Sequence, residues 1–136
     1  MASKSEKSEV DIHHEELISG LLNQMKVIFE SSEQPMYLYL DDNHWACNKR
    51  FADLLGYKSP EELVSLELHF MDVLVSEKSQ DSLVTAYGNA IERKVGSTIE
   101  VTWKKNNGRT VDTNVILVPV AYDGHLFALH FLSIIA

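Results

Sequence analysis

The segment NKRFADLLGYKSPEEL, residues 48–63, determines the fold prediction for this chain. Asn48 is a favourable helix N-cap, because its side-chain oxygen can accept a free amide of the first turn. Phe51 and the leucines three and four residues later share one helix face. Gly56 follows where a left-handed residue would end the helix. The first half of the segment therefore predicts a short helix with one apolar face.

The second half of the segment predicts another helix start. Ser59 can cap it, Pro60 occupies the first helical position, and Glu62 can reach back to complete a capping box. Any two-helix corner would explain these residues one by one. The whole combination, in this order and at this spacing, is more specific than that.

The composition is typical of a single folded globular domain. The chain has 136 residues, of which 45% are hydrophobic and 9% aromatic, enough for a core. Its formal net charge of −8 argues against nucleic-acid binding and against docking to anionic membranes. The single cysteine, Cys47, excludes an internal disulfide and a cysteine-based zinc site. With no apolar run of membrane-spanning length and no signal peptide, we expect a reducing, cytoplasmic location.

The N-terminal part predicts a disordered tail over residues 1–9 and an amphipathic helix over residues 10–30. The apolar stripe of this helix consists of Ile18, Leu21, Leu22, Met25, Ile28 and Phe29. A stripe at helical spacing must be covered by other apolar groups. It can pack on the chain's own sheet or on a second copy. We expect a homodimer in which this helix takes part.

The remaining pattern predicts a mixed domain over residues 31–136. Alternating or apolar runs indicate strands at Met36–Leu40, His44–Cys47, Ile99–Trp103, Thr110–Val120 and Leu126–Ile135, and helical spacing indicates helices at Phe70–Leu74 and Ser79–Lys94. The expected fold class is α+β, with one five-stranded antiparallel sheet whose one face is covered by helices. The first and last strands are apolar on both sides, so their outer face also needs a cover. The N-terminal helix is available for that role.

This order of elements, together with residues 48–63, resembles the PAS (Per-Arnt-Sim) sensor family over roughly residues 27–135. Residues 103–109, WKKNNGR, resemble the family's characteristic hairpin, with Asn107 where Asp is common. The resemblance implies a signal-sensing or relay module that acts by small-molecule binding, by homodimerisation or by both. It also implies a downstream signalling protein as a partner.

The resemblance also bears on cofactors. Light-sensing flavin members carry a cysteine on the short helix, and haem-binding members carry a histidine on the long helix. Residues 69–74 contain no cysteine, and residues 79–94 contain no histidine, with Gln80 or Asp81 near the expected position. The photoactive cinnamate-binding members also need a cysteine that is absent here. A covalent flavin switch and a family-type haem site are therefore disfavoured, and the cofactor, if any, is unknown.

No catalytic motif is present, so we expect a protein that is not an enzyme. Asp41, Asp42 and Asn43 read as turn formers before His44, and we expect no metal site there. His130 lies within an apolar strand, where a buried imidazole is usually a satisfied core residue. It could also bond a ligand or titrate near neutrality. The candidate walls of a ligand pocket are Phe51, Leu55, Met71, Leu74, Leu83, Tyr87, Trp103 and His130. The same side chains would fill an ordinary core.

Two other functions remain open. The first is a ligand-free protein-interaction module that works only by dimerising. The second, less expected, is a small α+β isomerase or hydrolase. Such an enzyme would need at least two titratable groups that converge in one cavity, and His130 alone is not enough.

Overall fold

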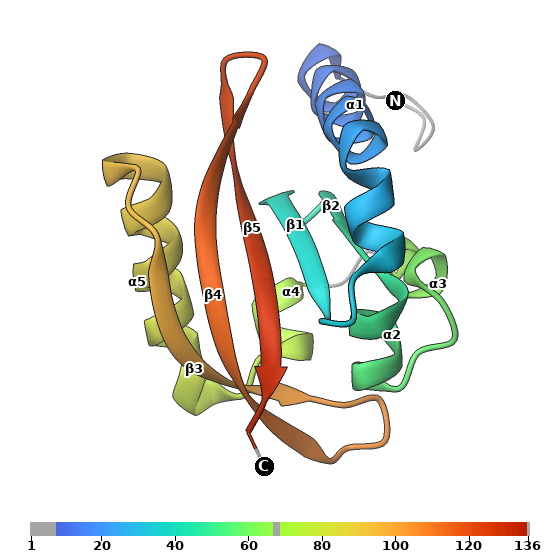
Figure 1. Ribbon diagram of the computed structural model, residues 1–136, viewed down its shortest axis with the longest axis vertical. Coiled ribbons are helices and arrows are strands. Elements are labelled where there is room, and N and C mark those ends of the chain that lie inside the picture. The colour runs from blue at the N-terminus through green and yellow to red at the C-terminus, as the bar shows by residue number, and fades with distance from the viewer. Residues whose placement is uncertain (1–7, 67–68, 136) are drawn as a thin grey trace, which may run out of the picture.

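The computed structural model describes residues 8–66 and 69–135, which surround one twisted sheet (Figure 1). The elements are, in chain order, α1 (Glu9–Ser31), β1 (Met36–Asp41), β2 (His44–Cys47), α2 (Lys49–Leu55), α3 (Pro60–Ser65), α4 (Phe70–Leu74), α5 (Glu77–Arg93), β3 (Ser97–Lys104), β4 (Thr110–Tyr122) and β5 (His125–Ile134). These bounds agree with the predicted elements to within a few residues. None of the helices in these described ranges is long and apolar enough to cross a membrane.

The described strands form a five-stranded antiparallel sheet in the order β2-β1-β5-β4-β3. The first and last strands of the chain therefore meet at its centre. In their register Tyr37 lies opposite His130, and Leu38 lies opposite Leu129. Because side chains alternate along a strand, each pair points to a different face. The predicted α+β class and sheet are confirmed.

One face of the sheet packs against α2–α5 and forms the larger core. Its fully buried side chains include Tyr37, Phe51, Leu55, Leu63, Leu74, Trp103, Leu117 and Leu132. Trp103 is buried together with a polar partner, since its indole N–H donates to the Thr113 hydroxyl at 2.9 Å. That hydroxyl in turn donates to the Val101 carbonyl at 3.0 Å. These two bonds satisfy the indole N–H of Trp103 and the hydroxyl of Thr113 inside the core.

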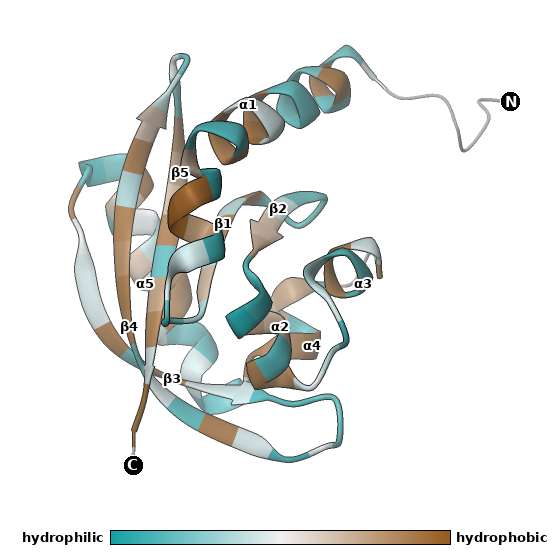
Figure 2. Ribbon diagram, turned by 45° about the vertical axis from the view of Figure 1, so that its right-hand side comes forward, coloured by the Kyte–Doolittle hydropathy of each residue, from teal (hydrophilic) through white to brown (hydrophobic). Residues whose placement is uncertain are grey.

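The opposite face of the sheet is partly covered by α1, which lies beside β1 and β2 in Figure 1. The buried members of this smaller core are Leu17, Leu21, Phe29, Met36, Leu38, Phe127 and Leu129. Figure 2 shows hydrophobic segments on α1 and on β4 and β5. At Gly20 the helix faces the Tyr122 side chain of β4, whose hydroxyl oxygen occupies the space that a Cβ would need. The N-terminal helix thus packs on the chain's own sheet.

The apolar stripe of α1 is only partly turned toward that sheet. Leu21 and Phe29 are buried there, and Ile18, Leu22 and Met25 are half-buried against the same cluster. Ile28, which the sequence pattern assigns to the stripe, is 53% exposed. Leu17, which that assignment omits, is 2% exposed and belongs to the contact.

The helix α1 begins where a serine caps it. The Ser8 hydroxyl accepts from the Asp11 N–H at 3.1 Å, so the helix starts at Glu9. Two residues of the predicted tail are therefore the cap and the first turn of this helix. Residues 1–7 of that tail lie outside the described residues.

The segment at residues 48–63 folds as a corner that Asn48 ties to the sheet. The Asn48 side-chain oxygen accepts from the Phe51 N–H, which caps α2, and from the Met36 N–H, both at 3.0 Å. Its amide group donates to the Gln34 carbonyl at 2.9 Å. One 4% exposed side chain therefore joins the start of α2 to the start of β1.

The rest of the corner follows the predicted caps with one difference. Gly56 ends α2 with a left-handed φ of 87°, and the Ser59 hydroxyl caps α3 by accepting from the Glu62 N–H at 3.0 Å. The capping box is not closed as expected. The Glu62 carboxylate accepts from the Lys58 N–H at 3.4 Å, one residue before the N-cap.

The β3–β4 hairpin turns at Asn107 and Gly108, as predicted, with Gly108 at a φ of 84°. The hairpin also contacts α2. The Asn106 N–H donates to the Leu55 carbonyl at 2.7 Å, at the end of that helix. The second predicted turn, at Asp123 and Gly124, has positive φ at both residues and joins β4 to β5.

Candidate functional site

A small cavity lies between the centre of the sheet and helices α4 and α5. Its volume is about 130 Å³, and its lining residues are Tyr37, Tyr39, Phe70, Met71, Leu83, Val84, Tyr87 and His130. Nearly all of these side chains are apolar or aromatic. Val84 is 56% exposed, so the cavity reaches the surface beside α5. An apolar cavity of about 150 Å³ is large enough to bind benzene.

Tyr37 is the centre of the aromatic groups around this cavity. Its ring stacks on the ring of His130 with centroids 3.8 Å apart and an interplanar angle of 12°. The stack follows from the sheet register, because the two residues are opposite each other on β1 and β5. Phe51 and Phe70 lie against the same ring, with centroids 4.9 Å and 5.1 Å away. The Tyr37 ring is therefore fixed in position from several sides.

The Tyr37 hydroxyl is buried, and no group in the described part of the chain hydrogen-bonds to it. The two other tyrosines at the cavity differ: the Tyr39 hydroxyl bonds the Asp42 carboxylate, and the Tyr87 hydroxyl donates to the Leu40 carbonyl at 3.2 Å. A buried polar group without a partner is costly. Burial also raises the pKa of Tyr37 well above its ordinary value, so the hydroxyl remains a hydrogen-bond donor.

His130 is neutral in this environment. Burial lowers the pKa of its imidazole to about 3, although bonds to the backbone of Tyr37 and Ala128 act in the opposite direction. Its Nδ1 lies 3.1 Å from the Ala128 carbonyl oxygen. The residue therefore does not titrate near neutral pH. Titration near neutrality was a possibility that the sequence left open. A neutral imidazole and a protonated phenol do not exchange protons readily at that pH, so the cavity favours binding over acid–base chemistry.

The residues predicted to form the pocket divide into two groups. Met71, Leu83, Tyr87 and His130 line the cavity. Phe51, Leu55, Leu74 and Trp103 are fully buried in the surrounding core. They support the lining side chains without being part of it.

The prediction omitted Tyr37, Tyr39, Phe70 and Val84, which also line the cavity. Tyr37 and Tyr39 have a signal in the sequence, because they alternate with Met36, Leu38 and Leu40 in one strand. That alternation places both tyrosines on the same face of the sheet. The pattern is missed when the strand is treated as apolar on both sides, as in the sequence-based prediction. The contact of Phe70 and Val84 with the cavity depends on how α4 and α5 pack, which no local pattern encodes.

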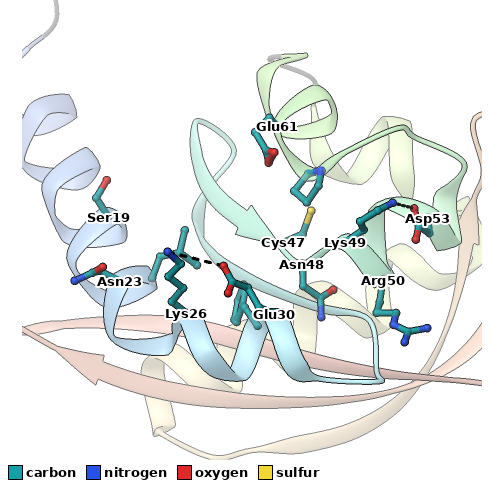
Figure 3. Close-up of a pocket in the computed structure, with 13 residues that line it drawn as sticks. Ser19, Asn23, Lys26, Glu30, Cys47, Asn48, Lys49, Arg50, Asp53 and Glu61 are labelled. Carbon is teal, nitrogen blue, oxygen red and sulfur yellow. Dashed lines mark hydrogen bonds and ion pairs between the residues drawn. The ribbon is translucent and has the colours of Figure 1, made fainter.

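A second hollow is the open groove between α1 and the corner formed by α2 and α3. Its volume is about 890 Å³, and Figure 3 shows side chains from both sides of it. The charged groups in this groove partly pair with one another: Lys49 bonds Asp53 at 2.7 Å, and Lys26 lies 4.0 Å from Glu30. Compared with the cavity, it is wide, exposed and lined mostly by polar surface residues.

Cys47 lies at this groove but is 7% exposed. Burial raises the pKa of its thiol to about 12, with a smaller contribution from the Glu61 charge. The thiol is therefore protonated near neutral pH and is a poor nucleophile. Its position after β2 agrees with a packing role.

Gln80 occupies the region where the family resemblance would place a haem ligand. Its side-chain amide donates to the carbonyls of Met71 and Val75, both at 3.2 Å. These bonds fasten α5 to α4.

Comparison by sequence gives no match to any protein-family model or to any curated protein. Comparison by structure does give matches. The PAS domain of an HTR-like protein from Haloarcula marismortui has a TM-score of 0.64 and 19% identity, and the alignment covers 90% of this chain and 98% of that one.

Two further solved structures agree with that match. A PAS domain from Colwellia psychrerythraea has a TM-score of 0.66 and 18% identity, and the alignment covers 85% of this chain and 97% of that one. The LOV protein of Rhodobacter sphaeroides has a TM-score of 0.68 and 14% identity, with 87% and 68% covered. At such identities the likeness is one of fold. The chain has the PAS fold.

Proposed function

We propose that this chain is a sensory module of signal transduction that binds a small, mostly apolar molecule in the cavity beside Tyr37. The observation that carries the proposal is that Tyr37 lines the cavity while its buried hydroxyl has no partner among the described residues. A ligand with one hydrogen-bond acceptor would satisfy it. The PAS fold supports this assignment, because one of the structures with the same fold is the PAS domain of a two-component sensor histidine kinase.

The sheet offers a route from the cavity to α1. Tyr37 points into the inner core, whereas its neighbours Met36 and Leu38 point into the outer core that α1 completes. A ligand that moves β1 would therefore also change the packing of the helix. Such a response requires that the ligand binds one arrangement of the helix better than the other.

Two benzene derivatives with one small substituent each test the ligand chemistry. Benzaldehyde has a carbonyl acceptor, whereas toluene has none. We expect the wild-type protein to prefer benzaldehyde by about 2–10-fold, because one net hydrogen bond is worth about 0.5–1.5 kcal/mol. The preference should disappear in Tyr37→Phe. Dissociation constants from titrations followed by NMR give both ratios.

Tyr57→Phe is the matched control, because Tyr57 packs at the edge of the same core but does not line the cavity. It should keep the wild-type preference. If neither probe binds at millimolar concentration, or if Tyr37→Phe keeps the preference for benzaldehyde, the proposed ligand site is wrong. A ligand-free interaction module would then be the better assignment.

Homodimerisation is a second candidate, and the exposed apolar residues favour it. On α1, Val27 is 76% exposed and Ile28 is 53% exposed, and on the outer face of β4, Ile116 is 45% exposed. The helix covers only part of that sheet face. A second copy that packs on it would bury these side chains, each worth roughly 1.5–3 kcal/mol.

Native mass spectrometry and light scattering test the dimer directly. We expect the intact chain to have twice its monomer mass, and a double variant, Ile28→Glu with Ile116→Lys, to be monomeric. Val95→Lys is the control, since Val95 is 50% exposed but lies between α5 and β3. If the intact chain stays monomeric at high concentration, the dimer proposal is wrong, and α1 only covers the sheet of its own chain.

A further inference from the structure

Histidines gather at one end of the molecule, around the β1–β2 turn. Five of the six histidines in the chain take part: His13, His14, His44, His69 and His125. They come from the start of α1, from β2, from the residue before α4 and from the start of β5. In Figure 1 the N-terminal end of α1 and the tip of the β4–β5 hairpin lie at the same end of the molecule. The fold therefore concentrates imidazoles that the sequence distributes widely.

Asp41 joins two of these histidines. Its two carboxylate oxygens lie 3.0 Å from His14 Nδ1 and 2.7 Å from His44 Nδ1. One ligand atom from each of the three residues lies within 4.8 Å of the other two. Ligands around a tetrahedral zinc ion are about 3.3 Å apart, given bonds of about 2.0–2.1 Å. A small rotation of one imidazole would therefore allow all three residues to share an ion.

We propose that His14, Asp41 and His44 bind one divalent transition-metal ion, for which Zn²⁺ is the representative. Two imidazoles and one carboxylate suit zinc and its neighbours, whereas Mg²⁺ and Ca²⁺ prefer sites made of oxygen ligands. The ion would fasten the first turns of α1 to the turn between β1 and β2. This site shares no residue with the cavity beside Tyr37.

Two observations favour a built site over a chance contact. The His44 side chain is 5% exposed and that of His14 is 23% exposed, so both are held by their surroundings. The Asp41 carboxylate is oriented by a further bond, since it accepts from the Asn43 N–H at 3.0 Å. Oriented ligands are typical of metal sites. The sequence alone predicts only a turn here, because His14 lies 27 positions from Asp41.

Calorimetric titration of the tag-free chain with Zn²⁺ tests the site, with Co²⁺ absorption as a second reading of the coordination. We expect one ion per chain, with no competition from a large excess of Mg²⁺ or Ca²⁺. His14→Gln and Asp41→Asn should each weaken Zn²⁺ binding at least about tenfold. Both variants keep the size of the side chain and alter partly exposed positions. His44→Gln gives a third test, with circular dichroism to confirm its folding.

His69→Gln is the matched control. This side chain is 86% exposed and lies 3.9 Å from Asp42, outside the three ligands. It should bind Zn²⁺ as the wild type does. The proposal is overturned if the wild type does not bind Zn²⁺ at submillimolar concentration. It is also overturned if His14→Gln and Asp41→Asn leave the affinity unchanged, since the three residues would then form a hydrogen-bonded cluster only.

Discussion

Replacing Asn48 by alanine should lower the free energy of unfolding by roughly 3 kcal/mol. The substitution removes the cap of α2, worth about 1 kcal/mol. It also leaves the Met36 N–H and the Gln34 carbonyl without the partners described above. The Met36 N–H is buried, and a buried group that loses its partner costs about 1–3 kcal/mol, whereas Gln34 is exposed and its carbonyl can bond water instead. Urea unfolding followed by circular dichroism measures the change.

Asn23→Ala is the control for Asn48→Ala, because Asn23 is exposed on α1. Its effect should stay within about 0.5 kcal/mol, as for most surface substitutions. A loss below about 1 kcal/mol in Asn48→Ala would mean that the corner at residues 48–63 does not depend on this side chain.

Acid should destabilise the protein through His130. An unfolded histidine has a pKa near 6.5, whereas burial lowers the pKa of folded His130 to about 3. Between these values the unfolded chain binds a proton that the folded chain does not, so stability falls as the pH falls. The contribution is fully present above pH 6.5 and is lost at about 1.4 kcal/mol per pH unit below it.

Urea unfolding at pH 7 and at pH 4.5 measures this effect for the wild type and for His130→Gln. The acid loss of the variant should be smaller by about 2–3 kcal/mol, because glutamine has no proton to gain. The quantity to compare is the loss in unfolding free energy between pH 7 and pH 4.5, since the substitution can also change the stability at both pH values by the same amount. His69→Gln replaces an exposed histidine and should show the wild-type loss. An equal acid loss in His130→Gln would mean that this imidazole is not held neutral.

Local patterns in the sequence predict most of the fold. The caps at Asn48 and Ser59, the left-handed Gly56 and the turn at Gly108 are formed by groups close together in the chain. These caps and turns can therefore be predicted from a short window of sequence. The order of the strands in the sheet is different. No short window of sequence encodes it, because pairing β1 with β5 joins segments about 90 residues apart.

The site could be predicted only in part. The sequence indicates that Leu83, Tyr87 and His130 face inward, but it cannot tell a filled core from a cavity. That difference depends on how a few side chains pack. One of them is Tyr37, whose hydroxyl has no hydrogen-bond partner among the described residues. The contact between His14 and Asp41 is equally difficult to predict from the sequence. It depends on where α1 docks on the sheet, which its apolar stripe does not specify uniquely.

The proposed function requires that a ligand in the cavity beside Tyr37 is coupled to α1. The most direct test is an NMR experiment on the intact chain with benzaldehyde, which locates the probe by intermolecular NOEs and reports every backbone amide. We predict NOEs from the probe to Tyr37, Leu83 and Tyr87, together with shifted amides in β1 and in the half of α1 that packs on it. NOEs to the groove beside Cys47 and Arg50 would place the ligand elsewhere, and bound probe with no shifted amide in α1 would mean that the cavity and the helix are not coupled.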